Sequence, residues 1–248
     1  MDNRLQDIVE NLDKYLIGID DPFKFKCLSC GKCCKNREDI LFTARDVFRI
    51  AQYLGKKPYE IIQQYCDCYV GTDSRMPIVR LKPVGSNKAC PFLRDKRCAI
   101  HAVKPVVCAL YPVGRMVQIP IEGTGETAKI TASYILQPTD CGSHTRTNTV
   151  RQWLERFNIP VDDEFYSEWN ELITEISGII RDADQKFTKA SIDPLYDVLG
   201  GLLYTRYDTA EAFMPQFMAN KKDAIAITKS VFVEFNRPMI NQRGAENG

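Results

Sequence analysis

The segment Cys27-Leu28-Ser29-Cys30-Gly31-Lys32-Cys33-Cys34 places four thiols within eight residues and shows no apolar periodicity. Cysteines at i, i+3 and i+6 can turn their sulfurs toward one centre, and Gly31 allows the backbone to curl with little steric strain. All ten cysteines lie between residues 27 and 141, and the two histidines, His101 and His144, lie in or beside that window. The sequence therefore predicts a metal-binding loop around which the N-terminal half of the chain is organised.

The composition of the 248-residue chain is that of an ordinary globular protein. Its net charge of +1 argues against a general polyanion binder. The first residues lack a basic stretch followed by an apolar core, and no apolar run approaches the roughly 18 residues that span a bilayer. We therefore expect a cytoplasmic protein without a membrane segment. In a reducing compartment, clustered cysteines bind metal or act in redox chemistry more often than they form disulfides.

Short helices and strands are predicted around the cysteines. Apolar residues at helical spacing over 4–17 predict an N-terminal amphipathic helix. Thr43 and Asp46 resemble a capping box that starts a helix running to about Leu54, and Pro58 suits the first turn of the next helix. Residues 76–84 alternate like a short strand, and their prolines suit an edge position.

A β-hairpin is predicted next, with strands at about 115–121 and 129–137 around a turn at 122–126. The turn region formally matches the dinucleotide-binding pattern G-x-G-x-x-A from Gly123, but no helical pattern follows it, so a hairpin turn is the better interpretation. His144 lies in a polar run that predicts an exposed loop.

The rest of the chain is predicted to be helical. Apolar faces occur at 150–157 and 165–180, Asp193 and Pro194 suit the N-cap and first residue of a third helix, and 223–233 continues the pattern. Gly200-Gly201 marks close helix packing or a bend. The predicted fold class is α+β: a cysteine-cluster metal-binding domain over 1–145, with an N-terminal helix and a few short antiparallel strands, and a helical region over 146–248 packed on it.

The thiol spacing favours an iron–sulfur cluster, of the 4Fe-4S type, with zinc as the alternative. Zinc sites usually show two separated Cys-x2-Cys pairs, whereas Cys27, Cys30 and Cys33 form a triple. Bacterial ferredoxins use such a triple with a distant cysteine that precedes proline, as Cys90 does. Lysines and arginines flank both groups of cysteines, and we expect them to lower the pKa of the thiols and to offset the charge of a four-thiolate site.

Four motifs together resemble the CxxCxxCC cysteine-cluster family, also called YkgJ-like: Cys27-x2-Cys30-x2-Cys33-Cys34, Asp46-x2-Arg49-Ile50, Cys90-Pro91-Phe92-Leu93 and Pro105-x2-Cys108-x2-Tyr111-Pro112. The match spans about residues 27–141. The family is described as zinc- or iron-chelating and includes the cysteine-rich part of flagellin lysine methylases, which resemble iron–sulfur proteins. The resemblance implies metal binding, and position by position it implies the ligands Cys27, Cys30, Cys33, Cys34, Cys90, Cys98 and Cys108, with Cys141 a weaker eighth.

Some positions depart from the family pattern. The family usually shows tyrosine at His101 and arginine at Lys104 and Ala109, so His101 is either a substitute ligand or a structural residue, and the lost arginines argue against an anion-binding role there. Cys66 and Cys68 lie outside the pattern, and we interpret them as core or surface thiols.

Adjacent cysteines usually point in different directions, so Cys33 and Cys34 fit two centres better than one. Eight thiols would serve two four-ligand sites, or one cluster plus structural or redox cysteines. The sequence does not assign the sets.

Three functional hypotheses follow. The first is a metal-dependent binding or redox module with a protein partner or substrate. The second is a methyltransferase related to flagellin lysine methylases, although no Walker loop, HExxH motif or Cys-x3-Cys-x2-Cys loop of radical enzymes occurs. The third is zinc-knuckle contact with RNA, which ranks last because few aromatic residues interleave the lysines, so nucleic-acid binding is not expected.

Overall fold

The computed structural model describes residues 3–36, 39–118, 130–183 and 189–235. Helices and helical turns in these ranges are α1 (Asn3–Glu10), α2 (Leu12–Tyr15), η1 (Lys32–Cys34), α3 (Ala44–Leu54), α4 (Pro58–Tyr65), η2 (His101–Val103), α5 (Val106–Leu110), α6 (Val150–Glu155), α7 (Glu164–Ala183), α8 (Lys189–Gly200), the π-helical turn η3 (Gly201–Thr205) and α9 (Phe213–Phe235). Strands are β1 (Leu16–Ile17), β2 (Pro22–Lys26), β3 (Leu41–Phe42), β4 (Cys66–Val70), β5 (Pro77–Leu81), β6 (Leu93–Arg94), β7 (Arg97–Cys98), β8 (Val113–Gln118), β9 (Thr131–Leu136) and β10 (Ser143–Thr149).

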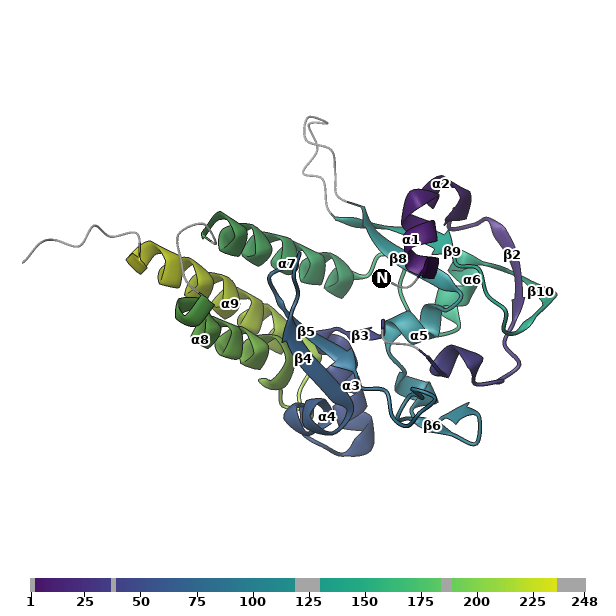
Figure 1. The fold of residues 1–248 in the computed structure, drawn as a ribbon, viewed down its shortest axis with the longest axis horizontal. Coiled ribbons are helices and arrows are strands. Elements are labelled where there is room, and N and C mark those ends of the chain that lie inside the picture. Colours follow the sequence, from purple (N-terminus) through teal and green to yellow (C-terminus); the bar gives the residue numbers. More distant parts are fainter. Residues whose placement is uncertain (1–2, 37–38, 119–129, 184–188, 236–248) are drawn as a thin grey trace, which may run out of the picture.

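The described strands form small antiparallel sheets in the orders β1-β9-β8, β10-β2, β3-β5-β4 and β6-β7. In Figure 1, α7, α8 and α9 form a helical layer at one end, α3, α4 and the β3-β5-β4 sheet lie in the middle, and the remaining sheets with α5 and α6 lie at the other end. Helices combined with short antiparallel strands confirm the predicted α+β class. The predicted division near residue 145 stays a prediction.

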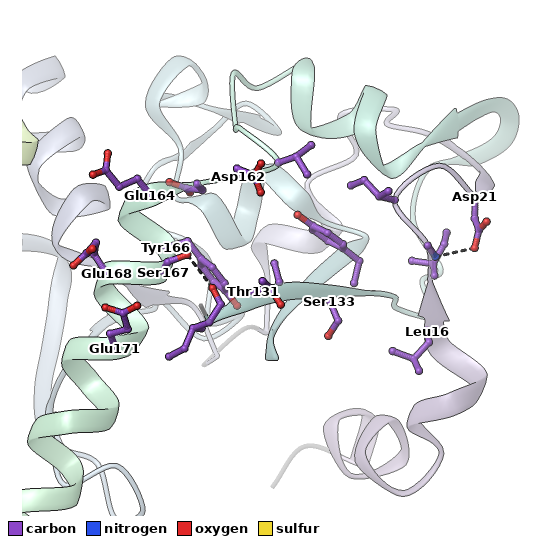
Figure 2. A pocket seen from close by; sticks show the side chains of 18 residues that line it. Leu16, Asp21, Thr131, Ser133, Asp162, Glu164, Tyr166, Ser167, Glu168 and Glu171 are labelled. Carbon is purple, nitrogen blue, oxygen red and sulfur yellow. Dashed lines mark hydrogen bonds between the residues drawn. The ribbon is translucent and has the colours of Figure 1, made fainter. Parts of the chain in front are cut away.

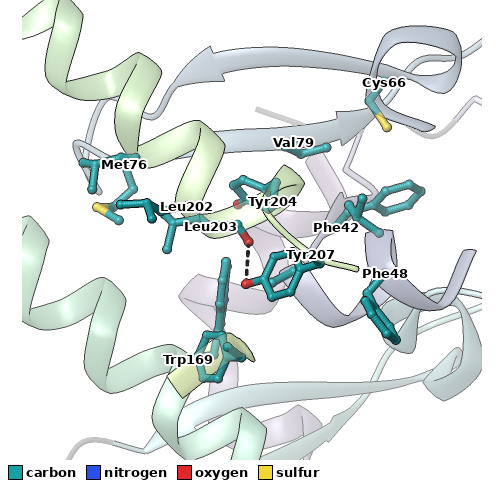
Figure 3. Close-up of a cluster of buried hydrophobic side chains, with 14 of the residues drawn as sticks. Phe42, Phe48, Cys66, Met76, Val79, Trp169, Leu202, Leu203, Tyr204 and Tyr207 are labelled. Atoms are coloured by element: carbon teal, nitrogen blue, oxygen red, sulfur yellow. Dashed lines mark hydrogen bonds between the residues drawn. The ribbon is translucent and has the colours of Figure 1, made fainter. Parts of the chain in front are cut away.

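A large apolar core joins the middle of the molecule to the helical layer. Figure 3 shows Phe48, Trp169 and Tyr207 in this core, which α3, the β3-β5-β4 sheet, α7, α8, η3 and α9 build together. The buried Tyr204 hydroxyl donates a hydrogen bond to the Pro77 carbonyl at 3.1 Å, so η3 is tied to the start of β5. Such bonds matter because a buried hydroxyl without a partner is costly.

A second core lies at the other end of the molecule. Phe23 and Phe25 of β2 meet the Trp153 ring edge-on, with ring centroids 5.8 and 5.6 Å from it. The Trp153 indole N–H donates to the Leu110 carbonyl at 2.8 Å, which fixes α6 against α5. Cys90, Cys98 and Cys108 pack against the first core and Cys30 and Cys33 against the second, so the cysteine region lies between the two cores.

Several predicted elements are confirmed. Helix α3 starts at a Thr43–Asp46 capping box and ends at Gly55, whose φ of 62° is left-handed, and α4 begins at Pro58. Helices also form at the predicted apolar faces in α6, α7 and α9. Strands β8 and β9 pair as the predicted hairpin. Its expected turn at 122–126, with the G-x-G-x-x-A match, lies outside the described residues.

Three other predictions, for residues 4–17, for 76–84 and for His144, were wrong. The helix expected over 4–17 is interrupted at Asn11 and ends at Tyr15, because Leu16 and Ile17 pair with β9. Strand β5 is central rather than at an edge, since Pro77 is its first residue and its backbone beyond that proline bonds to both β3 and β4. His144 lies in strand β10, paired with β2, rather than in a loop.

Helix α8 also differs from its prediction. It begins at Lys189, so Pro194 lies inside the helix instead of at its first position. Gly200 and Gly201 do not mark close packing, because a Cβ at either would meet no neighbouring atom, and the chain continues there into the π-helical turn. None of the described helices combines the length and apolarity needed to cross a bilayer.

Candidate metal centre

A cavity of about 560 Å³ lies between the two cores, and every predicted ligand lines it. The cysteines reach it from several segments: the stretch between β2 and η1, η1 itself, the residues before β6, β7, α5 and the residues before β10. The thiols that line it are Cys27, Cys30, Cys33, Cys34, Cys90, Cys98, Cys108 and Cys141. Segments more than a hundred residues apart in sequence therefore meet at one site.

The turn that carries Cys33 and Cys34 is tighter than the sequence suggests. Gly31 has a φ of 70°, in the left-handed region that favours glycine, and the chain then enters the 3₁₀ turn η1. This turn places the Sγ atoms of Cys33 and Cys34 3.9 Å apart. The two side chains therefore lie close together here, and the expectation that they serve two centres stays a prediction. Sulfurs at about 2.3 Å from a tetrahedral zinc ion lie about 3.8 Å from each other, so this pair can bind one ion.

Backbone pairing joins this turn to the second group of cysteines. The Cys90 N–H donates to the Cys34 carbonyl at 2.8 Å, and Lys35 and Ala89 form an isolated antiparallel bridge. These bonds hold the two segments in register, so Cys33 and Cys90 approach the cavity from adjoining strands of chain. Because the two segments are far apart in sequence, this contact could not be predicted from the sequence alone.

Burial dominates the acidity of three of the thiols. It raises the pKa of Cys90, Cys98 and Cys141, although backbone N–H groups near Cys90 and the Lys104 ammonium near Cys98 favour the thiolate. The expectation that nearby cations would lower these pKa values is thus wrong, because the loss of water outweighs them. A bound metal ion would have to displace these protons.

Cys33 lies near three other thiols of the cavity. Its negative charge, when ionised, is one of the causes that raise the pKa of each of Cys90, Cys98 and Cys141. Cys30 acts in the same way on Cys141. In their present conformation no three histidine, cysteine, aspartate or glutamate side chains of the described ranges converge closely enough to hold a metal ion. A metal ion could therefore bind in the cavity only if some of these side chains rotate.

The charged residues that line the cavity, apart from the cysteines, are basic. Five cations line it, and no aspartate or glutamate does so within the described parts of the chain. His101 also lines it; burial and the neighbouring Lys104 lower its pKa, which favours the neutral form that can bind metal. The cationic residues are Arg49, Lys96, Arg97, Lys104 and Arg156.

Cys66 and Cys68 lie apart from the cavity, on strand β4. Cys66 is buried in the first core, and burial raises its pKa to about 12, whereas Cys68 is exposed. These positions agree with the interpretation of the two residues as core and surface thiols. They make Cys68 a useful control for experiments on the cavity.

A second cavity, of about 1000 Å³, has the opposite charge and was missed from the sequence. Figure 2 shows Asp162, Glu164, Glu168 and Glu171 on its α7 side and Asp21 across from them. Among the described residues no lysine, arginine or histidine lines it. Glu168 and Glu171 are paired with Lys221 of α9, at 2.5 and 3.2 Å. The only sequence signal was the helical spacing of the acidic residues in α7.

Comparisons with known proteins match this region of the chain. Residues 26–142 match the CxxCxxCC family, described as "Putative zinc- or iron-chelating domain". The uncharacterized protein MJ0661 of Methanocaldococcus jannaschii is 36% identical over 103 residues, which are 40% of this chain and 48% of that protein. The chain thus matches about half the length of this relative. No solved structure matches. The family match covers residues 26–142, which contain all ten cysteines, and so confirms the resemblance seen in the sequence.

Proposed function

We propose that the cysteine-lined cavity holds a metal centre, with a 4Fe-4S cluster as the first candidate, and that the protein acts as a metal-dependent binding or redox module in the cytoplasm. The observation that carries the proposal is the convergence of eight cysteines on one cavity that contains no carboxylate among its described residues. Thiolates are the ligands that zinc and iron–sulfur clusters share. The match of residues 26–142 to a zinc- or iron-chelating family supports the same conclusion.

Cys33 is a proposed ligand because it lines the cavity and lies close enough to Cys90, Cys98 and Cys141 to affect their pKa values. The order Cys27, Cys30, Cys33 with Cys90-Pro91 supports a cluster, since a triple and a distant cysteine before proline are ferredoxin features. A bound cluster would supply one-electron transfer. The chain's own residues would hold it, shield it between two apolar cores and balance its charge with the five cations.

Zinc is the second candidate, and one distance favours it. The 3.9 Å between the Cys33 and Cys34 sulfurs matches the edge of a four-thiolate zinc site, which is about 3.8 Å. Thiolates of a 4Fe-4S cluster bind different irons and lie farther apart. Bound zinc would stabilise the fold without redox chemistry. The methyltransferase and RNA-binding interpretations stay predictions, since neither the fold nor the comparisons test them.

The test is anaerobic purification followed by absorption spectroscopy and iron, sulfide and zinc analysis on one sample. A band near 400 nm, roughly where thiolate-to-iron charge transfer lies, with about four irons per chain supports the cluster. A colourless protein with stoichiometric zinc supports the second candidate instead. Cys30→Ala should lose the metal, while the matched control Cys68→Ala, outside the cavity, should keep it. Equal metal content in all three proteins, or none in the wild type, would refute the proposal.

A further inference from the structure

No described carboxylate pairs with the cations of the cysteine cavity. None of Arg49, Lys96, Arg97, Lys104 and Arg156 forms an ion pair with a described aspartate or glutamate. Arg49 of α3 is half-buried, and it makes no hydrogen bond to any described residue either. Burying part of a guanidinium group without a hydrogen-bond acceptor costs free energy, so such a group usually binds an anion.

Two of the cations are positioned on one aromatic wall. The Lys104 ammonium lies 4.2 Å from the Phe157 ring centroid, and the Arg156 guanidinium lies 4.5 Å from that of Trp153. The two rings meet edge-on with their centroids 6.0 Å apart. Contacts between a cation and an aromatic face restrict where the charge lies but leave its N–H donors available. The wall therefore presents two oriented cations to the cavity.

The proposed metal centre does not use up this positive charge. Four thiolates around zinc, or around an oxidised four-iron cluster, carry about two negative charges, which leaves a surplus of three positive charges in the cavity. Two such centres would still leave a surplus of one. The cavity is also larger than a metal ion needs, since sulfur ligands lie only about 2.3 Å from zinc. Its volume of about 560 Å³ falls in the range of small-molecule sites, about 300–1,000 Å³.

We propose that the cavity also binds an oxyanion, the phosphate or carboxylate group of a small molecule, through Arg49, Lys104 and Arg156. This inference rests on the proposed function, because the metal-bound thiolates set the charge that the cations must balance. It also revises the sequence argument against anion binding. The family arginines at 104 and 109 are absent, but Lys104 keeps one charge and the fold brings Arg49 and Arg156 to the same cavity.

The experiment is calorimetric titration of the metal-loaded protein with inorganic phosphate and, separately, with acetate, at an ionic strength held constant with sodium chloride. Saturable binding is expected for at least one of the two, and the tighter one identifies the group as phosphate or carboxylate. Arg49→Gln and Arg156→Gln should each weaken binding at least about tenfold, because each loses charge-assisted hydrogen bonds. Arg206→Gln is the matched control, since Arg206 is exposed, pairs with Asp223 and does not line the cysteine cavity.

Metal content is measured on the same samples, so a failure of the oxyanion site can be distinguished from a failure of the metal centre. A metal-loaded wild type that binds neither anion more tightly than chloride overturns the oxyanion site and leaves the metal centre standing. A wild type without metal overturns the proposed function. If a variant does not fold, the wild-type titrations still test the oxyanion site, because they compare phosphate and acetate with chloride. Equal binding by Arg49→Gln, Arg156→Gln and Arg206→Gln shows that these arginines do not form the site.

Discussion

The carboxylate of Asp46 accepts a hydrogen bond from the backbone N–H of Val106 at 2.9 Å, across sixty residues of sequence. Its other oxygen accepts from the Thr43 N–H at 2.9 Å and from the Thr43 hydroxyl at 2.8 Å. One buried side chain therefore caps α3 and also satisfies the first turn of α5, the helix that carries Cys108. This contact links the stability of the first core to the position of a proposed ligand.

Replacing Asp46 with alanine should lower both stability and metal affinity. The free energy of unfolding should fall by about 2 to 4 kcal/mol, because the helix cap is lost and a buried N–H group is left without an acceptor. Metal affinity should fall by about tenfold, as for other residues that position ligands. Urea denaturation and a chelator competition measure the two effects. Glu60→Ala is the matched control, since Glu60 caps α4 at the same position but makes only the local bond to Lys57. Equal losses in both variants would contradict the role assigned to Val106.

Cys33 and Cys34 form a natural pair for testing the ligand set. With a cluster, Cys33→Ser should reduce the metal content to below about a tenth, because Cys33 completes the triple with Cys27 and Cys30, whereas Cys34→Ser should keep at least half. Metal analysis of both variants, with Cys68→Ser as the reference, provides the measurement. Equal, complete loss in both variants would favour one zinc ion held by the two sulfurs, which lie 3.9 Å apart.

Local signals were strong enough to predict much of this arrangement. The capping box of Thr43 and Asp46 starts α3 where expected, because such caps depend only on residues three positions apart. The resemblance to the CxxCxxCC family implied eight ligand cysteines, and all eight line one cavity. These features are encoded within short stretches of chain, which a single sequence displays.

Contacts between distant segments could not be predicted. Strand β10 is mostly exposed and polar, so it lacks the alternation that identifies a strand, and only its pairing with β2 defines it. Tertiary packing also creates the hydrogen bond between Asp46 and Val106, and it brings Arg49 and Arg156 to the lining of one cavity. The prediction that the thiol pKa values are lowered was wrong for a related reason. The sequence shows flanking charges but not burial, and burial is the larger cause of the pKa shifts.

Cys66 should make stability depend on alkaline pH. Its pKa is about 12 in the folded protein, above the ordinary value of 9.0, because burial disfavours the thiolate. The stabilisation from the protonated thiol is therefore complete below pH 9 and is lost as the pH rises toward 12. Between pH 8 and pH 10.5 the wild type should lose about 2 kcal/mol more than Cys66→Ala, as measured by urea denaturation. The exposed Cys68 should also react with iodoacetamide much faster than Cys66. Parallel pH curves for the two proteins would show that the Cys66 thiol is not protected in this way.

Asp163 should have the opposite pH dependence. Its buried carboxylate is held by Arg45, with N···O distances of 2.7 and 2.5 Å, and by Arg115 at 3.3 Å, so its pKa is lowered although burial alone would raise it. A lowered pKa contributes stability that is present above the unfolded value of about 3.9 and is lost as the pH falls below it.

Asp163→Asn leaves two largely buried guanidinium groups without a counter-charge and should cost about 3 to 5 kcal/mol at pH 7. The cost should shrink only as the pH falls below about 4, because the unfolded wild-type chain then binds a proton at this residue, whereas the folded carboxylate does so only at lower pH. Asp20→Asn is the matched control: Asp20 also pairs with an arginine, Arg151, but both side chains are exposed to solvent, so the loss of stability should be much smaller. Urea denaturation of the three proteins at several pH values gives the comparison. A similar small loss in both variants would mean that the Arg45–Asp163–Arg115 group does not hold α3, β8 and the start of α7 together.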